Sequence, residues 1–288
     1  MPPLVSVIVP NYNHKAYLQQ RLDSIFNQSF TNFEVILLDD ASTDGSTDLL
    51  HRYKNHPQVS QYVVNEKNSG SPFRQWQRGI ALAKGEYIWI AESDDYCSPD
   101  FLKTLMERAN DETGLYYAQT IDVNEKGEEL LHRVVYTQEF DPNIWEGDFT
   151  LSGNEFITYL LVKNVIPNAS GVIFKRDLVT ADTFSPDLLQ MRMCGDWFFW
   201  AKLCTQTRVG FVNKPLNYFR DHQKTSRNHH SLEKKKKRIA EEGIIREYIY
   251  RKAKLRNRIK EDQNKRIWFS YHSYKECFTP EFYAFKLP

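Results

Sequence analysis

Residues 85–95 decide the fold, and they read Gly85-Glu86-Tyr87-Ile88-Trp89-Ile90-Ala91-Glu92-Ser93-Asp94-Asp95. The apolar run Tyr87–Ala91 is rich in aromatic and β-branched residues, which predicts a strand buried on both faces. Ser98 as an N-cap and Pro99 at the first helical position then predict a helix. The acids therefore occupy the turn after the carboxyl end of a buried strand, where open α/β sheets bind ligands.

Three acids stand within four residues in this turn: Glu92, Asp94 and Asp95. Carboxylates packed this closely repel one another unless a cation or solvent neutralises them. Hard oxygen ligands with room for phosphates suit Mg²⁺ or Mn²⁺. The alternative is a solvated acidic turn, but the buried strand before the acids favours a metal site.

The composition is that of an ordinary globular chain, with 288 residues, 41% hydrophobic residues and a formal net charge of +1. This near-neutral balance gives no global reason to expect binding to nucleic acid. The four cysteines form no CxxC pair, which favours a reducing compartment over a disulfide framework or a zinc site. No apolar run reaches about 18 residues and no signal peptide begins the chain, so we expect a cytoplasmic protein.

Strands and helices alternate through the first 110 residues. Apolar runs predict strands at 4–9, 33–38, 61–64 and 87–91. This alternation predicts an α/β fold with a doubly wound, mostly parallel sheet that is flanked by helices. Right-handed crossovers then bring the loops at 10–13, 39–45 and 92–98 to one edge of the sheet. Because two of these loops are acidic, we expect one cleft at that edge.

The second half of the predicted domain is less regular. Strands are predicted at 115–118, 171–176, 209–212 and 216–220, with a partly β excursion at 119–150 and a helix at 153–163. Asp196 precedes a run of aromatic residues at helical spacing and is predicted as the N-cap of that helix. We therefore expect one domain over 1–227, whose two halves meet at about residue 110.

Residues 228–288 differ in composition and form a predicted helical C-terminal extension. The run Lys234–Lys237 begins a charged segment that carries isoleucines and tyrosines at helical spacing, which predicts one or two amphipathic helices to about 272. Two interpretations stay open. The helices either cover the domain, or present a basic face for peripheral contact with an anionic membrane at its inner face.

Several motifs appear in a fixed order along the first 226 residues, and together they resemble the inverting glycosyltransferases of family 2, which have the GT-A fold. The motifs are Ser6-Val7-Ile8-Val9-Pro10-Asn11-Tyr12-Asn13, Asp39-Asp40-Ala41-Ser42-Thr43-Asp44-Gly45-Ser46, Gly85-Glu86-Tyr87-Ile88, Ser93-Asp94-Asp95, Gly195-Asp196-Trp197-Phe198-Phe199-Trp200 and Leu216-Asn217-Tyr218. The chain departs from the family pattern at Arg78-Gly79 and at Glu92, which stands where an Asp often opens the metal motif.

The resemblance implies that about residues 1–110 form the nucleotide-sugar half of the domain and about residues 111–227 its acceptor half, with the nucleotide site at the ends of the first two strands. Pro10, Tyr12 and Asp40 would form a uracil pocket, in which the Tyr12 ring stacks on the base and the Asp40 carboxylate accepts from the ring N3–H. Asn13 and Asp94 are implied as further nucleotide contacts. Arg74 or Arg78 would face the diphosphate, although each is equally consistent with a surface arginine of a helix.

The resemblance also implies a metal site and a catalytic base. Asp95 would bind Mn²⁺ or Mg²⁺ beside the diphosphate, while Asp94 would contact the ribose or take the metal itself. His222 would close over the metal or the diphosphate, unless it is a structural histidine. Asp196 would take the proton of the acceptor hydroxyl, as an inverting transfer requires; its alternative role is that of a capping residue.

The function that this pattern implies is transfer of a sugar from a nucleotide-diphosphate sugar, expected to be UDP-linked, to a glycan or lipid-linked acceptor in cell-surface polysaccharide synthesis. A nucleotidyltransferase is the alternative among enzymes, but it would carry a glycine-rich basic loop after the first strand, where this chain has Pro10-Asn11-Tyr12-Asn13. A non-catalytic nucleotide- or glycan-binding module is the alternative outside enzymes. It would be favoured by loss of Asp196 or of the Asp94-Asp95 pair, and both are present.

Overall fold

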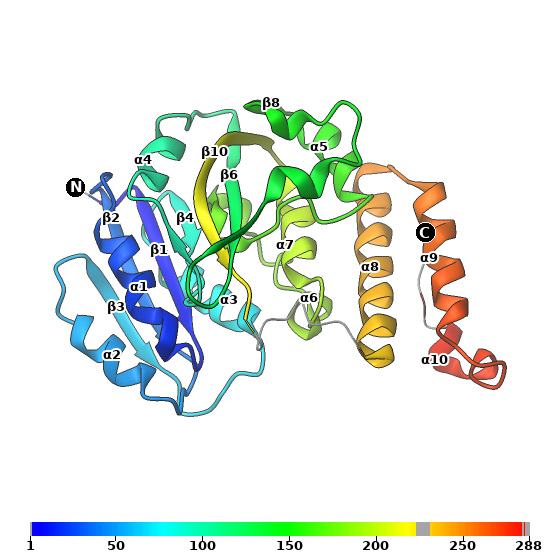
Figure 1. The fold of residues 1–288 in the computed structure, drawn as a ribbon, viewed down its shortest axis with the longest axis horizontal. Coiled ribbons are helices and arrows are strands. Elements are labelled where there is room, and N and C mark those ends of the chain that lie inside the picture. The colour runs from blue at the N-terminus through cyan, green and yellow to red at the C-terminus, as the bar shows by residue number, and fades with distance from the viewer. Residues whose placement is uncertain (1, 223–230, 284, 286–288) are drawn as a thin grey trace.

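One mixed sheet organises the molecule, with helices on both of its faces (Figure 1). The structure is a computed structural model that describes residues 2–222, 231–283 and 285. Within these residues the strand order is β3-β2-β1-β4-β9-β6-β10-β5, while β7 pairs with β6 and β8 with β10. The fold is therefore α/β and GT-A-like, as the sequence predicts.

The first four long strands are parallel, and they are β1 (Val5–Asn11), β2 (Phe33–Asp39), β3 (Val59–Val64) and β4 (Tyr87–Ile90). Every residue of β1, β2 and β4 is buried, which explains why these strands read as continuous apolar runs. The helices between them are α1 (Lys15–Phe26), α2 (Ser46–Tyr53) and α3 (Pro72–Leu82). The strands predicted within residues 1–110 are confirmed.

The second half of the predicted domain mixes strand directions. Strand β9 (Val172–Lys175) runs antiparallel to both β4 and β6 (Thr113–Val123), and β10 (Arg208–Arg220) runs parallel to β6. The predicted strands at 209–212 and 216–220 are one strand, whose register shifts on both sides of Pro215. Proline has no N–H for the ladder, so the strand bulges there without ending.

Short elements complete this half. The predicted partly β excursion contains β7 (Glu129–His132), β8 (Phe149–Leu151), and the 3₁₀ turns η1 (Arg133–Thr137) and η2 (Ile144–Glu146). It is followed by α5 (Gly153–Leu160), the turn η3 (Ala169–Gly171), η4 (Arg176–Leu178) and α6 (Pro186–Gln190). Strand β5 (Tyr96–Cys97), which the sequence analysis missed, pairs with the end of β10 and holds the acidic turn against it.

Two helix starts differ from the prediction. Helix α4 (Phe101–Met106) has Asp100 as its N-cap, so it begins after the predicted Ser98-Pro99 start. Helix α7 (Gly195–Cys204) has Cys194 as its N-cap, so Asp196 is the second helical residue and the N-cap prediction is wrong. A Cβ on Gly195 would lie 2.2 Å from the Phe73 ring, so the glycine allows close packing inside the helix.

Two apolar clusters lie on opposite faces of the sheet. One contains side chains of α3, α5 and α7, and the other contains side chains of α1 and α4. Alternate residues of β1 enter the two clusters, Ile8 on one side and Val7 and Val9 on the other. The helices thus hold the strand ends, and the loops that follow them, at fixed positions.

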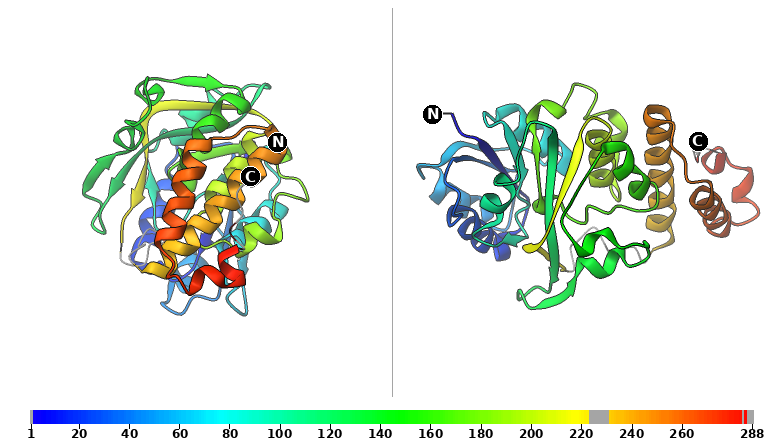
Figure 2. Two further views of the ribbon diagram at one scale, coloured as in Figure 1. Left: turned by 90° about the vertical axis from the view of Figure 1, so that its right-hand side faces the viewer. Right: turned by 90° about the horizontal axis from the view of Figure 1, so that it is seen from above.

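Two long helices follow in the C-terminal extension, α8 (Leu232–Ala253) and α9 (Arg258–Ser270), and then η5 (Glu276–Phe278) and α10 (Pro280–Tyr283). Helix α8 packs on α7, and α9 lies outside α8 (Figure 2). Ile245 and Ile249 of α8 belong to the same core cluster as α7. The predicted boundary at 227/228 lies outside the described residues. Across the described part of the chain, every helix is too short or too polar to cross a membrane.

Candidate active site

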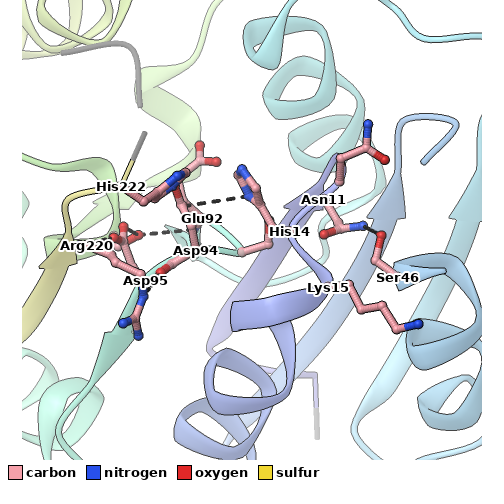
Figure 3. Close-up of polar contacts among 12 residues, drawn as sticks. Asn11, His14, Lys15, Ser46, Glu92, Asp94, Asp95, Arg220 and His222 are labelled. Carbon is pink, nitrogen blue, oxygen red and sulfur yellow. Dashed lines mark hydrogen bonds and ion pairs between the residues drawn. The ribbon is translucent and has the colours of Figure 1, made fainter. Parts of the chain in front are cut away.

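The loops after β1 and β2 are locked together at the carboxyl ends of the strands. The Asn11 amide donates to Asp39 Oδ2 at 2.8 Å and to Ser46 Oγ at 2.9 Å (Figure 3). Asn13 has φ of 58° and accepts from the Thr43 N–H at 2.7 Å. A left-handed backbone is uncommon for a residue other than glycine and marks a loop that its surroundings hold in place.

The predicted uracil pocket lies on these loops. Tyr12 is 46% exposed, so one face of its ring is available for stacking. Asp40 is buried, and its Oδ1 accepts from the side-chain amides of Asn65 and Gln75 and from the Ser69 N–H. Its Oδ2 accepts from Ser69 Oγ at 2.8 Å, which leaves that oxygen a lone pair.

For the other residues predicted to contact the nucleotide, the structure gives a position but no contact that supports this role. Pro10 is buried within β1. Arg74 and Arg78 lie exposed on α3, and Arg78 donates to the side-chain oxygen of Asn65. Arg78 therefore borders the loop that holds Asp40, while Arg74 lies on the solvent side of the same helix.

Asp94 lies between two histidines (Figure 3). His222 Nε2 is 3.0 Å from Asp94 Oδ2, and His14 Nδ1 is 4.0 Å from Asp94 Oδ1. One ligand atom from each of the three residues lies within 4.8 Å of the others. Burial favours a raised pKa for Asp94, but the His222 hydrogen bond and the nearby imidazoles outweigh it and lower that pKa. This carboxylate is therefore ionised and can bind a cation.

Asp95 points away from the histidines and is held by the protein. Its carboxylate accepts from Ser170 Oγ at 2.6 Å, from the Asn168 amide at 2.9 Å and from the Arg220 N–H at 3.0 Å. It is 1% exposed. Burial and the charge of Asp94 raise the pKa of Asp95. These bonds fix the acidic turn to β10 and η3, so the structure favours Asp94 over Asp95 as the metal-binding carboxylate.

Glu92 closes the other side of the acidic turn. Its Oε1 accepts from the Trp76 indole N–H at 2.7 Å. Burial, followed by the charge of Asp94, raises the pKa of Glu92 to about 8. At neutral pH this side chain is therefore mostly protonated, and it adds little negative charge to the turn.

A cleft of about 480 Å³ joins the acidic turn to the start of α7. Its lining includes His14, Glu92, Asp94, Asp95, Asn164 and Asp196, together with Arg133 and Tyr136 of η1, Trp197 of α7 and Arg238 of α8. Pro10, Tyr12, Asn13, Asp40, Arg74 and Arg78 are not among the described residues that line this cleft. The cleft thus brings together Asp94, which is a predicted metal ligand, and Asp196, which is the predicted base.

Asp196 faces the cleft from the first turn of α7. Its Oδ2 accepts from the Asn164 amide at 3.1 Å. Burial raises the pKa of Asp196 to about 6, against the lowering effect of hydrogen bonds from backbone N–H groups and Asn164. A carboxylate with this pKa is ionised at neutral pH and is a better proton acceptor than an exposed aspartate.

Sequence reasoning missed three residues of this region. His14 follows the loop motif directly and could have been noticed as a potential ligand beside the strand-end acids. Arg220 is fully buried and its side chain donates to the carbonyls of Asp94, Asn124 and Glu125. Asn164, the partner of Asp196, lies in a turn with no motif around it, and only the tertiary structure reveals its position.

The sheet order, the strand-end acids and the cleft define a protein of the GT-A class. The chain belongs to glycosyl transferase family 2, whose sequence profile matches residues 6–176. The match covers the nucleotide half, the acidic turn and β9, and it ends before Asp196.

Relatives and solved structures agree with this assignment. EpsH of Bacillus subtilis (strain 168) is 26% identical over 223 residues, which are 76% of this chain and 61% of EpsH. Residues 1–349 of Staphylococcus aureus TarS in complex with UDP-GlcNAc match with a TM-score of 0.65 at 20% identity, over 96% of this chain and 73% of that one. The Pyrobaculum calidifontis mannosyltransferase PcManGT, solved with GDP-Man and Mn²⁺, matches with a TM-score of 0.56 at 18% identity, over 85% and 64%.

Proposed function

We propose that this chain is a metal-dependent inverting glycosyltransferase that moves a sugar from a UDP-linked donor to a hydroxyl group of a glycan or lipid-linked acceptor in cell-surface polysaccharide synthesis. One observation carries the proposal. A single cleft contains Asp94, which lies beside His14 and His222, and also Asp196, the proposed proton acceptor. Membership of family 2 supports sugar transfer, and the UDP-GlcNAc complex of TarS supports a UDP-linked donor.

A divalent cation fits the site around Asp94. The donor set combines one carboxylate with two imidazoles whose ligand atoms lie within 4.8 Å of one another. Mg²⁺ demands a near-ideal octahedral set of oxygen ligands, whereas Mn²⁺ is the less demanding ion and tolerates nitrogen ligands better. We therefore expect Mn²⁺ to support activity better than Mg²⁺. When bound, the cation would supply positive charge that neutralises the leaving diphosphate.

The donor base is assigned to Tyr12 and Asp40. The exposed Tyr12 ring offers a stacking face, and the spare lone pair on Asp40 Oδ2 can accept from the N3–H of uracil. Guanine presents its N–H donors at a different position and on a larger ring system. The site would therefore prefer UDP to GDP.

Asp196 acts as the general base of the transfer. Its carboxylate takes the proton of the acceptor hydroxyl while the acceptor oxygen forms a bond to the anomeric carbon. The bond from that carbon to the diphosphate oxygen breaks, and its electron pair leaves with UDP. One displacement inverts the anomeric configuration and needs no protein nucleophile.

Turnover with a panel of UDP-sugars and Mn²⁺ tests the proposal. The protein should release UDP, and nuclear magnetic resonance of the freed sugar should show the inverted anomer first. Formation of UTP and a sugar 1-phosphate from the UDP-sugar and added pyrophosphate would instead identify a nucleotidyltransferase. Calorimetric binding of UDP without any turnover across a broad donor and acceptor panel would identify a binding module.

We also infer peripheral contact with an anionic membrane through the C-terminal extension. Residues 231–288 contain 16 Lys and Arg against 8 Asp and Glu, a net charge of +8, whereas residues 1–230 contain 22 against 29, a net charge of −7. The extension also exposes Phe269, Tyr274, Phe278 and Tyr283. Basic residues next to exposed aromatics suit an anionic lipid surface. The opposite charge of the catalytic part would orient the molecule on that surface.

A further inference from the structure

Helix α8 provides a buried carboxylate to the turn that leads into α7. Glu241 Oε1 accepts from the Arg192 N–H at 2.9 Å. Its Oε2 accepts from the N–H groups of Met193 at 2.9 Å and Cys194 at 2.8 Å. Glu241 is 5% exposed, and Asp196 follows this turn after one residue. A single carboxyl side chain thus accepts from three consecutive backbone N–H groups.

Helix α7 has no capping side chain of its own to do this. Its N-cap residue is Cys194, whose side chain makes no capping hydrogen bond. Backbone N–H groups near a helix start need acceptors when they are buried. Glu241, which belongs to α8, accepts the hydrogen bonds of the N–H groups in the turn before α7. Its negative charge also lies near the positive end of the α7 dipole.

A second residue of α8 holds the other segment that contacts Asp196. The Arg246 guanidinium is fully buried and donates to the carbonyls of Leu161 and Val162. Its Cζ also lies 5.3 Å from the centre of the Trp197 ring. Asn164, the hydrogen-bond partner of Asp196, comes two residues after Val162. Glu241 and Arg246 therefore fix both sides of the base.

We propose that Glu241 is a positioning residue that fixes the location of Asp196, and that α8 is for this reason a part of the active site. The proposal rests on the proposed role of Asp196 as the general base. It extends the site beyond residue 176, where the match to the family profile ends. A displacement of about 1 Å at a catalytic group can cost roughly 100-fold in rate, so a fixed turn matters.

Glu241 also acts on Asp196 through its charge, which a purely structural contact would not do. The charge of Glu241 is among the causes that raise the pKa of Asp196, after burial as the main one. Asp196 also has other titratable or charged neighbours. They are Arg238 on α8, Tyr136 on η1, Cys194 in the turn, and Glu92 and Arg192 on the walls of the cleft. All of these remain in a Glu241→Gln variant, so a shift in the pH profile would report on Glu241.

The experiment compares Glu241→Gln with Glu247→Gln, a control on the same helix whose carboxylate pairs with Arg251 at the surface. The readout is Mn²⁺-dependent hydrolysis of UDP-GlcNAc, or of whichever UDP-sugar the donor screen selects. We expect kcat of Glu241→Gln to fall about 10- to 100-fold, with UDP affinity within about twofold of the parent. The acidic limb of its kcat profile should move to lower pH, because a negative neighbour of Asp196 is lost. Amides 192–194 should exchange hydrogen faster.

Asp196→Asn is measured in parallel to separate the two proposals. If Asp196→Asn is inactive and Glu241→Gln matches the parent in kcat and pH profile, the positioning role is overturned while the base role stands. If Asp196→Asn is itself active, the base role fails. A Glu241→Gln protein that loses UDP affinity and melting temperature in proportion to activity, with an unmoved pH profile, would reduce Glu241 to a stabilising contact and would also overturn the proposal.

Discussion

His222 Nε2 lies 3.0 Å from Asp94 Oδ2, although 128 residues separate the two in the chain. The pairing requires β10 to run alongside the acidic turn, and the short strand β5 makes this connection through Asn217 and Cys97. His14 approaches the same carboxylate from the start of α1. The site is therefore assembled from three distant segments, and each of them can be tested separately.

Asp94 and Asp95 should respond differently to substitution. Asp94→Asn should abolish the dependence of UDP affinity on Mn²⁺, as EDTA should in the parent protein, with little change in melting temperature. Asp95→Ala should instead lower the free energy of unfolding by about 1–3 kcal/mol, because Ser170, Asn168 and the Arg220 N–H would lose their acceptor. Calorimetry and thermal melts measure both effects. Full turnover in EDTA would contradict a metal at this site.

The Tyr12 ring should contribute stacking energy without contributing to stability. Because this ring is 46% exposed, Tyr12→Ala should weaken UDP binding by about 1–3 kcal/mol and leave the melting temperature nearly unchanged. Asp40→Ala should weaken UDP binding and also lower the melting temperature, because the Asp40 carboxylate accepts hydrogen bonds from Asn65, Ser69 and Gln75. Isothermal titration with UDP and GDP provides the measurement. A parent protein that binds GDP as tightly as UDP would refute the uracil pocket.

The positions of the strand-end residues could be predicted because they depend only on neighbouring residues in the sequence. An apolar run predicts β4, and the acids that follow it must then lie at the carboxyl end of a buried strand. The same reasoning placed Asp40 after β2. The predictions therefore hold where one segment alone determines a position.

Contacts between distant segments could not be predicted in the same way. An acid directly before an aromatic run at helical spacing predicts an N-cap at Asp196, whereas the helix begins one residue earlier, at Gly195. Its role depends on the Phe73 ring from α3, which no local pattern reveals. The contacts of Glu241 likewise depend on how α8 packs against α7. An amphipathic pattern predicts that a helix forms, but it does not predict which element the helix packs against.

The membrane contact is tested best with point variants. Ile245 and Ile249 belong to the main core, so removal of the extension would disturb the catalytic part as well. Lys235→Gln with Lys237→Gln should weaken binding to phosphatidylglycerol vesicles by about 2 kcal/mol, at roughly 1 kcal/mol per lysine near the surface.

The matched control removes the same charge from the rest of the chain, with Lys67→Gln and Lys126→Gln at exposed positions. Vesicle sedimentation at increasing salt measures the effect, and binding should fall as ionic strength rises. Phe278→Ser should weaken binding further at high salt, where the apolar contribution remains. Equal partitioning of all variants, or tight binding to RNA in place of vesicles, would remove the proposed membrane role.

The pH dependence of turnover follows from the raised pKa of Asp196. The base must be ionised to accept a proton, and burial raises its pKa from 3.8 to about 6. Activity should therefore be lost as the pH falls through about 6, roughly two units above the value for an exposed aspartate, and should reach a plateau above pH 7.

Asp196→Asn keeps the size of the side chain and an oxygen that can accept from Asn164. It should lower kcat by about 10²–10⁴-fold with little change in UDP affinity or melting temperature. Near-normal transfer by this variant, or an acidic limb near pH 4 in the parent protein, would contradict the assignment of Asp196 as the base.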